Sequence, residues 1–395
     1  DDDGSYLSRT PSVAGNRKTW TYSIWVKRSN LGIYGKLFHE YSGQTARSEL
    51  AFDTSDFLRF NFGGDVETAL KPTQVFRDTS AWYHIIWSVD TTQSTASDRV
   101  NAYINGVKIT DFSEENYPAL NAESGINLAS QHEISGKDGA SQFIDGYLAE
   151  VNFIDGQALT PDSFGETGTY GEWKPIAYAG AYGTNGFYLD FKASGSLGND
   201  AAGSNNWTIH NLAATDQMVD SPTNNFCTLN PINNAGAYTY SEGNLTAYKT
   251  TAWNRGVGTM LMSSGKWYWE QLCLDQTYTQ GGTALETDSF TNHLGVGTHG
   301  VGYQSHTGAI YSNNSTIATV ATYTNGDVIG FALDMDNHTL QFFKNGASVY
   351  TMTNVSSVPA YAGISMYGST TALNFGADSS FAGNKTPQGN QDANG

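Results

Sequence analysis

The chain has 395 residues, a length that favours two domains of about 150 to 200 residues each over a single core. Its 43 Gly, 23 Tyr and 9 Trp, with only 15% charged residues, are typical of short strands, tight turns and aromatic cores, and they argue against long helices. The formal charge of -18 would be repelled by phosphate backbones and anionic lipid, which excludes nucleic acid and membrane surfaces as expected partners. We interpret the charge as a source of solubility, with attraction of cationic groups or metal ions as the alternative.

Cysteine usage and the chain ends add little chemistry. Cys227 and Cys273 are far apart and stand in unlike contexts, which indicates neither a disulfide framework nor a thiolate metal site. No apolar run reaches the roughly 18 to 20 residues that span a bilayer, so we expect no membrane anchor and no signal peptide. Because the sequence starts at Asp1 without Met and enters a strand pattern almost at once, we expect a fragment or a processed product.

The first half alternates apolar and polar residues between turns rich in Gly, Asn and Asp, which predicts antiparallel strands. In the first clear strand, Trp25 places an aromatic ring on the polar side. That position predicts a strand covered on both faces or, alternatively, a binding platform. Thr160 followed by Pro161 predicts one short helical turn capped by Thr160. The predicted strands, with the turns that end two of them, are 20–26, 83–89, 100–104 before Asn105-Gly106, and 148–154 before Asp155-Gly156.

The next region, from 165 to about 235, is dominated by Gly, Asn, Ala and Ser. Only residues 186–191 predict a strand there. We interpret the region as an interdomain connector that carries this one strand, and packing of the connector on one of the sandwiches is an alternative. Its Trp and Tyr residues give it apolar surface to bury, which argues against complete disorder.

The second half resumes strand alternation and predicts a second antiparallel sandwich, followed by a polar tail. The fold class predicted for the whole chain is all-β, with two antiparallel β-sandwiches joined by a Gly/Asn-rich connector. The predicted strands of the second half are 266–270, 293–297, 327–334, 340–343 and 372–376, with hairpin turns at Asn325-Gly326 and Asn345-Gly346. The predicted domains are 1–168, a connector 169–235, a second sandwich 236–383 and a linker or tail 384–395.

Two motifs suggest small ligands but are explained more simply. Residues 295–300 match the dinucleotide fingerprint, yet no helix pattern or βαβ unit surrounds them, so we predict no cofactor. His299 and His306 are the nearest histidine pair and lack further ligands at metal spacing, so we predict no transition-metal site. The segment Asp334-Met-Asp336-Asn337 offers oxygens for calcium, with a hairpin turn as the simpler explanation.

Separated motifs in both halves resemble two known domain families. The first domain resembles the laminin-G-like branch of the concanavalin A-like sandwiches over about residues 5–165, and the second resembles SPRY domains. The motifs that carry the first resemblance are Ser23-Ile-Trp25-Val-Lys27, Trp82-Tyr83-His84, Tyr103-Ile-Asn105-Gly106 and 146–151 with Leu159-Thr-Pro161. Those that carry the second are 265–270, Leu294-Gly-Val-Gly297, 326–334, Phe342-Phe-Lys-Asn345-Gly346 and Leu373-Asn-Phe375-Gly376.

The resemblance to concanavalin A-like sandwiches suggests two further kinds of site, a calcium site and a hydrolase active site. Laminin-G-like relatives sometimes hold calcium at a loop edge, which adds to the calcium alternative. Some concanavalin A-like sandwiches are hydrolases with Glu, Asp and Glu on one face of a strand, which sets the acid and the nucleophile about 5 Å apart. Glu49 and Asp53 come closest to this pattern but lack the spacing, and we interpret them as a solvated strand end. A Gly-x-Ser-x-Gly nucleophile elbow is also missing, so we expect no enzyme.

The pairing of the two domains, with connector motifs at 182–191 and 220–225, resembles large virion proteins of marine tailed phages. This resemblance implies a location on the virion surface, other virion subunits as partners and a homo-oligomer. The leading hypothesis is a tail-fibre or spike adhesion module that binds host-surface glycan or protein. The alternatives are a capsid-decorating or fibre-building protein without a host ligand, and an inactive relative of a polysaccharide-degrading enzyme.

Candidate ligand contacts are aromatic and polar residues that fall outside the core alternation. In SPRY-like domains we expect them in loops at one end, where loop packing is the alternative role for each. Asn and Gln amides together with aromatic faces suit sugars, because the rings stack on C–H patches and the amides pair with hydroxyls. The candidates are Trp253, Arg255, Tyr278, Tyr303 and His306, with Trp25 of the first domain.

Overall fold

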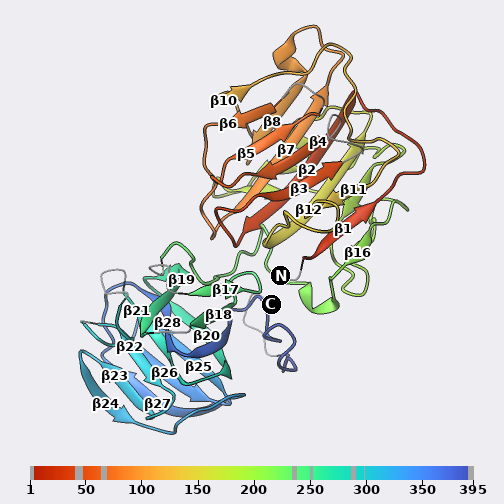
Figure 1. The fold of residues 1–395 in the computed structure, drawn as a ribbon. Helices are drawn as coiled ribbons and strands as arrows, with labels where there is room; N and C mark the ends of the chain where they lie inside the picture. Colours follow the sequence, from red (N-terminus) through yellow and green to blue (C-terminus); the bar gives the residue numbers. More distant parts are fainter. Residues whose placement is uncertain are drawn as a thin grey trace. The chain divides into compact units, whose positions relative to one another are not determined.

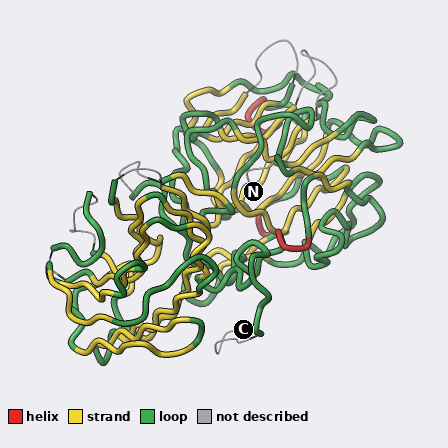
Figure 2. Tube along the Cα trace, turned by 60° about the horizontal axis from the view of Figure 1, so that its bottom comes forward, coloured by secondary structure: helices red, strands yellow, loops and turns green. Residues whose placement is uncertain are grey.

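The computed structural model describes residues 4–40, 48–63, 69–233, 238–249, 252–285, 291–297 and 299–389. The chain forms two compact units, Asp1–Asn225 and Phe226–Gly395. Both are built from antiparallel strands, as Figure 1 shows, and helical turns are few and short (Figure 2). The described residues contain no α-helix, and none of their helices is long and apolar enough to span a bilayer. The predicted all-β fold class is therefore confirmed.

The first unit packs an eight-stranded sheet on a six-stranded sheet. The eight-stranded sheet, in the order β10-β6-β5-β4-β3-β11-β1-β16, consists of β1 (Tyr6–Arg9), β3 (Gly35–Glu40), β4 (Ser48–Phe52), β5 (Leu58–Asn61), β6 (Ala69–Pro72), β10 (Phe112–Glu115), β11 (His132–Ile134) and β16 (Thr208–His210). The six-stranded sheet, in the order β15-β12-β2-β7-β8-β9, consists of β2 (Thr19–Arg28), β7 (Trp82–Asp90), β8 (Val100–Ile104), β9 (Val107–Lys108), β12 (Gly146–Asp155) and β15 (Phe187–Leu189). A separate hairpin pairs β13 (Gly165–Thr167) with β14 (Trp173–Pro175), and the 3-10 helices are η1 (Ala96–Asp98), η2 (Pro161–Ser163) and η3 (Ala214–Asp216).

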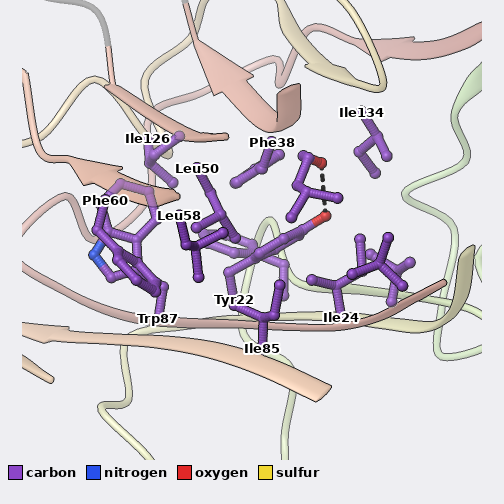
Figure 3. Packing of buried hydrophobic residues seen from close by; sticks show 14 of the residues in the cluster. Tyr22, Ile24, Phe38, Leu50, Leu58, Phe60, Ile85, Trp87, Ile126 and Ile134 are labelled. Atoms are coloured by element: carbon purple, nitrogen blue, oxygen red, sulfur yellow. Dashed lines mark hydrogen bonds between the residues drawn. The ribbon is translucent and has the colours of Figure 1, made fainter. Parts of the chain in front are cut away.

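The core between these two sheets follows from the alternation seen in the sequence. On β2, Trp20, Tyr22, Ile24 and Val26 belong to the core, where they meet residues of both sheets (Figure 3). The buried hydroxyl of Tyr22 donates a hydrogen bond to the carbonyl oxygen of Leu37 at 3.2 Å, so its polar group is satisfied. Full burial of each such side chain contributes about 1.5 to 3 kcal/mol.

The region predicted as a connector, 169–235, differs in the structure. Residues up to Asn225 belong to the first unit, and they supply three short strands where the sequence indicates one. The predicted strand 186–191 is present as β15, which pairs with β12, while β16 pairs with β1 and β14 pairs with β13. Strands of three residues have too few alternating positions to show periodicity, which explains why two of them are missed.

The predicted helical turn after Thr160 is present as η2 with Pro161 in its first turn. The predicted cap is absent, because the side chain of Thr160 makes no capping hydrogen bond.

The second unit is also a two-sheet sandwich. Its seven-stranded sheet, in the order β17-β18-β29-β20-β25-β26-β27, consists of β17 (Thr239–Ser241), β18 (Thr246–Lys249), β20 (Lys266–Asp275), β25 (Val328–Asp334), β26 (Thr339–Lys344), β27 (Ala347–Thr353) and β29 (Ser369–Asn374). Its six-stranded sheet, in the order β19-β28-β21-β22-β23-β24, consists of β19 (Asn254–Met262), β21 (Tyr278–Ala284), β22 (Val301–Gln304), β23 (Ala309–Ser312), β24 (Ser315–Thr319) and β28 (Ala360–Tyr367). Trp269, Phe331 and Phe342 anchor the core between the two sheets.

One predicted strand of the second unit, 293–297, is wrong. Gly295 and Gly297 adopt φ values of +82° and +103°, outside the range of regular strand residues, and the segment forms turns. Leu294 nevertheless buries its side chain, so the apolar residue that suggested a strand packs as part of a folded loop.

Phe381, near the end of the predicted second sandwich, packs with Leu272 and Ala372. The predicted tail differs near its start, because Lys385 donates a hydrogen bond from Nζ to the carbonyl oxygen of Gly326 at 2.7 Å. Residues 390–395 of the predicted tail lie outside the described residues.

Candidate ligand-binding site

The candidate site lies on the face of the six-stranded sheet of the second unit that points away from the core. On β28, Ile364 and Met366 belong to the core, so Ser365 and Tyr367 point to the opposite, outer face. The strand register then extends this face across the sheet. Tyr367 pairs with Tyr278, Ser365 pairs with Gln280 and Arg255, and Gln280 pairs with Gln304.

Aromatic rings gather at one end of this outer face. Tyr278 is their centre, with its ring centroid 6.1 Å from that of Trp253, 4.5 Å from His306 and 5.9 Å from Tyr367. His293 continues the group, 5.6 Å from Trp253 and 4.8 Å from Tyr311. Tyr278 is 37% exposed and Tyr367 is 40% exposed. We call these residues the aromatic cluster: Trp253, Tyr278, His293, His306, Tyr311 and Tyr367.

Next to the tyrosine pair, a row of buried polar side chains crosses three strands. Arg255, Ser365 and Gln280 are buried, although they belong to the outer face. Among the residues that the structure describes, neither the side-chain amide of Gln280 nor the hydroxyl of Ser365 has a hydrogen-bond partner. A buried amide without partners is costly, and a bound water or a ligand group are the two kinds of partner that would satisfy it. We call Arg255, Gln280 and Ser365 the polar floor.

The following row on the same face consists of glycines. Gly302, Gly282 and Gly363 stand side by side on β22, β21 and β28. Leu294 fills the space above Gly302 and Gly363, because a Cβ at these positions would lie 2.7 Å from the Leu294 Cβ and 3.0 Å from the Leu294 Cδ2, respectively. The segment 291–297 is therefore seated on the sheet, and this seat places His293 against Trp253. Gly295 of the fingerprint-like motif also serves close packing, because a Cβ there would lie 2.3 Å from the Tyr311 carbonyl oxygen.

The structure brings together three of the predicted site residues, Trp253, Tyr278 and His306. Arg255, expected in a loop, lies in β19 and belongs to the polar floor. Tyr303 is a correction, since it lies in β22 within the core and donates its hydroxyl to the Ala321 carbonyl oxygen. The alternation of residues in β22 does not by itself show which face of the strand packs on the other sheet. The register with the neighbouring strands shows that Tyr303 lies on the core face.

Sequence reasoning misses His293, Tyr311 and Tyr367. The signal that would find Tyr367 is the pairing of β21 with β28, which sets Tyr278 beside it. Desolvation lowers the pKa of His306 from its ordinary value, so its ring is predominantly neutral at neutral pH.

Trp25, the candidate of the first unit, is covered on both sides of its strand. It is 2% exposed and stacks on His84 at 4.7 Å with an interplanar angle of 5°. Trp173, from the region predicted as a connector, reaches the same cluster and donates from Nε1 to His84 Nδ1 at 2.8 Å. The alternative of a binding platform at Trp25 is therefore wrong, because residues 165–225 supply the cover.

Glu49 and Asp53 do not lie at the solvated strand end that the sequence predicts. Glu49 is buried, 2.7 Å from Lys36 Nζ and 2.7 Å from the Tyr34 hydroxyl, which donates to it. Asp53 is also buried and lies 2.8 Å from Lys71 Nζ. Both carboxylates are thus ion-pair partners of lysines.

The segment 334–337, considered as a calcium site, lies at the turn between β25 and β26. Asp334 Oδ1 accepts hydrogen bonds from the backbone N–H groups of Asp336 and Asn337 at 3.0 and 2.9 Å. These contacts are those of a hairpin turn. Within the described ranges, no group of three or more His, Cys, Asp or Glu residues is placed to hold a metal ion.

Comparison with known families matches each unit separately. Residues 1–163 match the model of the Concanavalin A-like lectin/glucanases superfamily, and residues 266–378 match the model of the SPRY domain. Both resemblances found in the sequence are thereby confirmed. No curated protein matches the chain.

Several solved structures are similar to part of this chain. The SPRY domain of human HERC1 is 20% identical, with 35% of this chain and 93% of that chain covered and a TM-score of 0.33. A human SPRY domain is 19% identical, with 36% and 97% covered and a TM-score of 0.29. The TRIM65 PSpry domain is 17% identical, with 38% and 92% covered and a TM-score of 0.33. Because the two family models match separate parts of the sequence, we conclude that the chain carries a concanavalin A-like domain followed by a SPRY domain.

Proposed function

We propose that the chain is a non-enzymatic adhesion module of a tailed-phage virion, and that the aromatic cluster of its SPRY domain binds a host-surface glycan or protein. The observation that carries this proposal is a set of exposed rings beside a buried polar floor whose amide has no partner among the described residues. Exposed aromatic faces and convergent polar groups are the two components of most ligand sites.

The two components act on different parts of a ligand. The rings of Trp253, Tyr278 and Tyr367 offer apolar area, which drives association when a ligand removes it from water. Gln280 has one donor group and one acceptor oxygen, both fully buried, so a ligand reaches them only by displacing a neighbouring side chain. A matched hydrogen bond at such a dry position discriminates strongly between ligands. The cluster therefore supplies affinity and the polar floor supplies specificity.

The virion setting rests on the sequence resemblance of the domain pairing and the connector motifs. In that setting the module faces the medium on the virion surface, with other virion subunits as neighbours in a homo-oligomer. Repetition of the module converts weak single-site binding into strong attachment through avidity. A site with a modest apolar area is thus sufficient for adhesion.

The experiment is binding of a fluorescent, multivalent form of the chain to candidate host cells. We expect Trp253→Ala and Tyr278→Ala each to weaken attachment by about tenfold, since an aromatic contact contributes on the order of 1 kcal/mol per site and avidity multiplies it. Tyr248→Ala is the matched control, because Tyr248 is 47% exposed and lies on β18, outside the cluster.

Treatment of the cells separates the two ligand classes. Periodate abolishes attachment if the ligand is a glycan, and protease abolishes it if the ligand is a protein. Absence of attachment by a well-folded multivalent form would contradict adhesion and favour a capsid-decorating or fibre-building role. Incubation with host polysaccharide should release no new reducing ends, and their appearance would contradict the non-enzymatic assignment.

A further inference from the structure

A second surface with ligand chemistry lies on the outer face of the seven-stranded sheet of the SPRY domain. Trp269 and Phe331 point into the core, so Tyr268 and Glu270 on β20 lie on the opposite face. The register continues this face across β25 and β26. Tyr268 pairs with Ala332, which pairs with Gln341, and Glu270 pairs with Gly330, which pairs with Phe343.

The ring of Tyr268 is held along this face. Its hydroxyl donates a hydrogen bond to Glu270 Oε1, two residues further along the same strand, at 2.9 Å. Two strand residues span about 6.6 Å, so the ring must extend along β20 to make this bond. A Cβ at residue 330 would lie 2.6 Å from the Tyr268 hydroxyl, so the glycine at this position lets the ring lie where it does. The ring rests on Gly330, while Tyr268 remains 55% exposed.

Polar groups and a second ring surround Tyr268. Phe343 lies 6.4 Å away in an edge-to-face arrangement. Glu270 Oε2 accepts a hydrogen bond from Asn374 Nδ2 at 2.9 Å, and Gln341 donates from Nε2 to the Ser348 hydroxyl at 2.9 Å. Each carboxylate oxygen of Glu270 has two lone pairs, so both keep capacity for a further donor. These contacts fix the side chains before any ligand arrives.

We propose that this surface, formed by Tyr268, Phe343, Glu270, Gln341 and Asn374, is a second binding site and that it takes a neutral pyranose unit of a polysaccharide. A pyranose ring presents a flat patch of C–H groups that stacks on a flat aromatic face, and its hydroxyls donate to carboxylate and amide oxygens at the edge of that face. The carboxylate of Glu270 disfavours uronate and other anionic sugars, because like charges repel. The site is independent of the aromatic cluster and goes beyond the function proposed for it.

The experiment is migration of the full chain through native gels that contain a panel of neutral polysaccharides: glucans, galactans, mannans and xylans. At least one should retard the wild-type chain, and Tyr268→Ala should weaken the apparent affinity by about tenfold. Tyr268→Phe keeps the ring but loses its tether to Glu270, so we expect a smaller loss. Gels with alginate or hyaluronan should leave migration unchanged.

One control variant, Tyr248→Ala, should be retarded like the wild-type chain. Trp253→Ala keeps this test separate from the test of the aromatic cluster, because it changes that cluster and leaves Tyr268 in place. The proposal is overturned if no neutral polysaccharide retards the chain, or if both Tyr268 variants are retarded as strongly as wild type. If Tyr268→Ala fails to fold, as judged by near-ultraviolet circular dichroism, the test depends on the folded Tyr268→Phe variant, which should be retarded less than the wild-type chain. Loss of retardation in Trp253→Ala alone would assign the sugar to the aromatic cluster and contradict a second site.

Discussion

His84 shows how the first unit uses a neutral histidine as a structural group. Its Nδ1 accepts a hydrogen bond from Trp173 Nε1, and an indole nitrogen can only donate. The proton of the neutral ring therefore sits on Nε2, which lies 2.8 Å from the Ser23 hydroxyl and donates to it. Burial lowers the pKa of His84 to about 3, so the ring remains neutral well below pH 6.

This pKa predicts a pH dependence of stability. An unfolded histidine titrates near pH 6.5, so as the pH falls from about 6.5 to 3 the unfolded state takes up the proton first. The free energy of unfolding of the first unit should then decrease by up to about 1.4 kcal/mol per pH unit from this residue. Urea titrations between pH 7 and pH 4.5 should give a shallower slope for His84→Gln. His299→Gln, in the other unit, is the control, and equal slopes for His84→Gln and wild type would contradict the prediction.

At the scale of elements, an ion pair anchors the end of the segment 165–225. Lys27 Nζ and Asp220 Oδ2 are 2.7 Å apart, and both side chains are fully buried. Asp220 Oδ1 also accepts a hydrogen bond from Trp82 Nε1 at 2.9 Å. This contact joins the segment to β2 and β7, over the outer face of the six-stranded sheet of the first unit.

Removing one charge of this pair should destabilise the first unit strongly. Asp220→Ala leaves the Lys27 ammonium without its buried counter-charge, which costs about 3 to 5 kcal/mol. The double variant Lys27→Met with Asp220→Leu should recover most of that loss, since it removes both charges and keeps apolar volume. Chemical denaturation of the three proteins measures this. A loss below about 1 kcal/mol in Asp220→Ala would show that the pair does not anchor the segment.

The packing of the segment 291–297 on the glycine row can be tested by substitution. A side chain at residue 302 would meet Leu294, so Gly302→Val should displace the segment and separate His293 from Trp253. We expect attachment to host cells to fall by about tenfold, because the aromatic cluster loses one wall. Gly195→Ala is a control at a glycine that has no positive φ and whose Cβ would meet nothing within 4 Å. Unchanged attachment of a folded Gly302→Val variant would exclude a role for the segment.

Local signals in the sequence predict part of these elements and miss others for physical reasons. The Asn105-Gly106 turn is present with φ values of +48° and +81°, as a type I′ turn requires. Trp253, Tyr278 and His306 are found because they interrupt an alternating pattern. Their neighbours, such as Tyr367, require knowledge of which strands pair, and that is decided by contacts distant in sequence.

At the scale of the whole molecule, the division of the chain after Asn225 has a consequence for folding. Residues 1–225 should fold cooperatively when expressed alone, and so should residues 226–395, because each has its own core. A fragment that ends at residue 168 lacks β15, β16 and the partner of Lys27, and it uncovers Trp25 and Trp82. We therefore expect that fragment to be poorly soluble. Circular dichroism and size-exclusion chromatography of the three fragments check this, and a soluble, cooperative 1–168 fragment would contradict it.

Hydrogen–deuterium exchange of the chain, with and without a saturating host envelope extract that supports attachment, tests most directly where the ligand binds. The proposal predicts slower exchange in β21, in the start of β19 and in the segment 291–297, which carry Tyr278, Arg255 and His293, respectively. Trp253→Ala should reduce this protection, and about ten times more extract should be needed to restore it. Protection confined to the first unit, or protection of these strands that is unchanged in Trp253→Ala, would contradict the assignment of the aromatic cluster as the adhesion site.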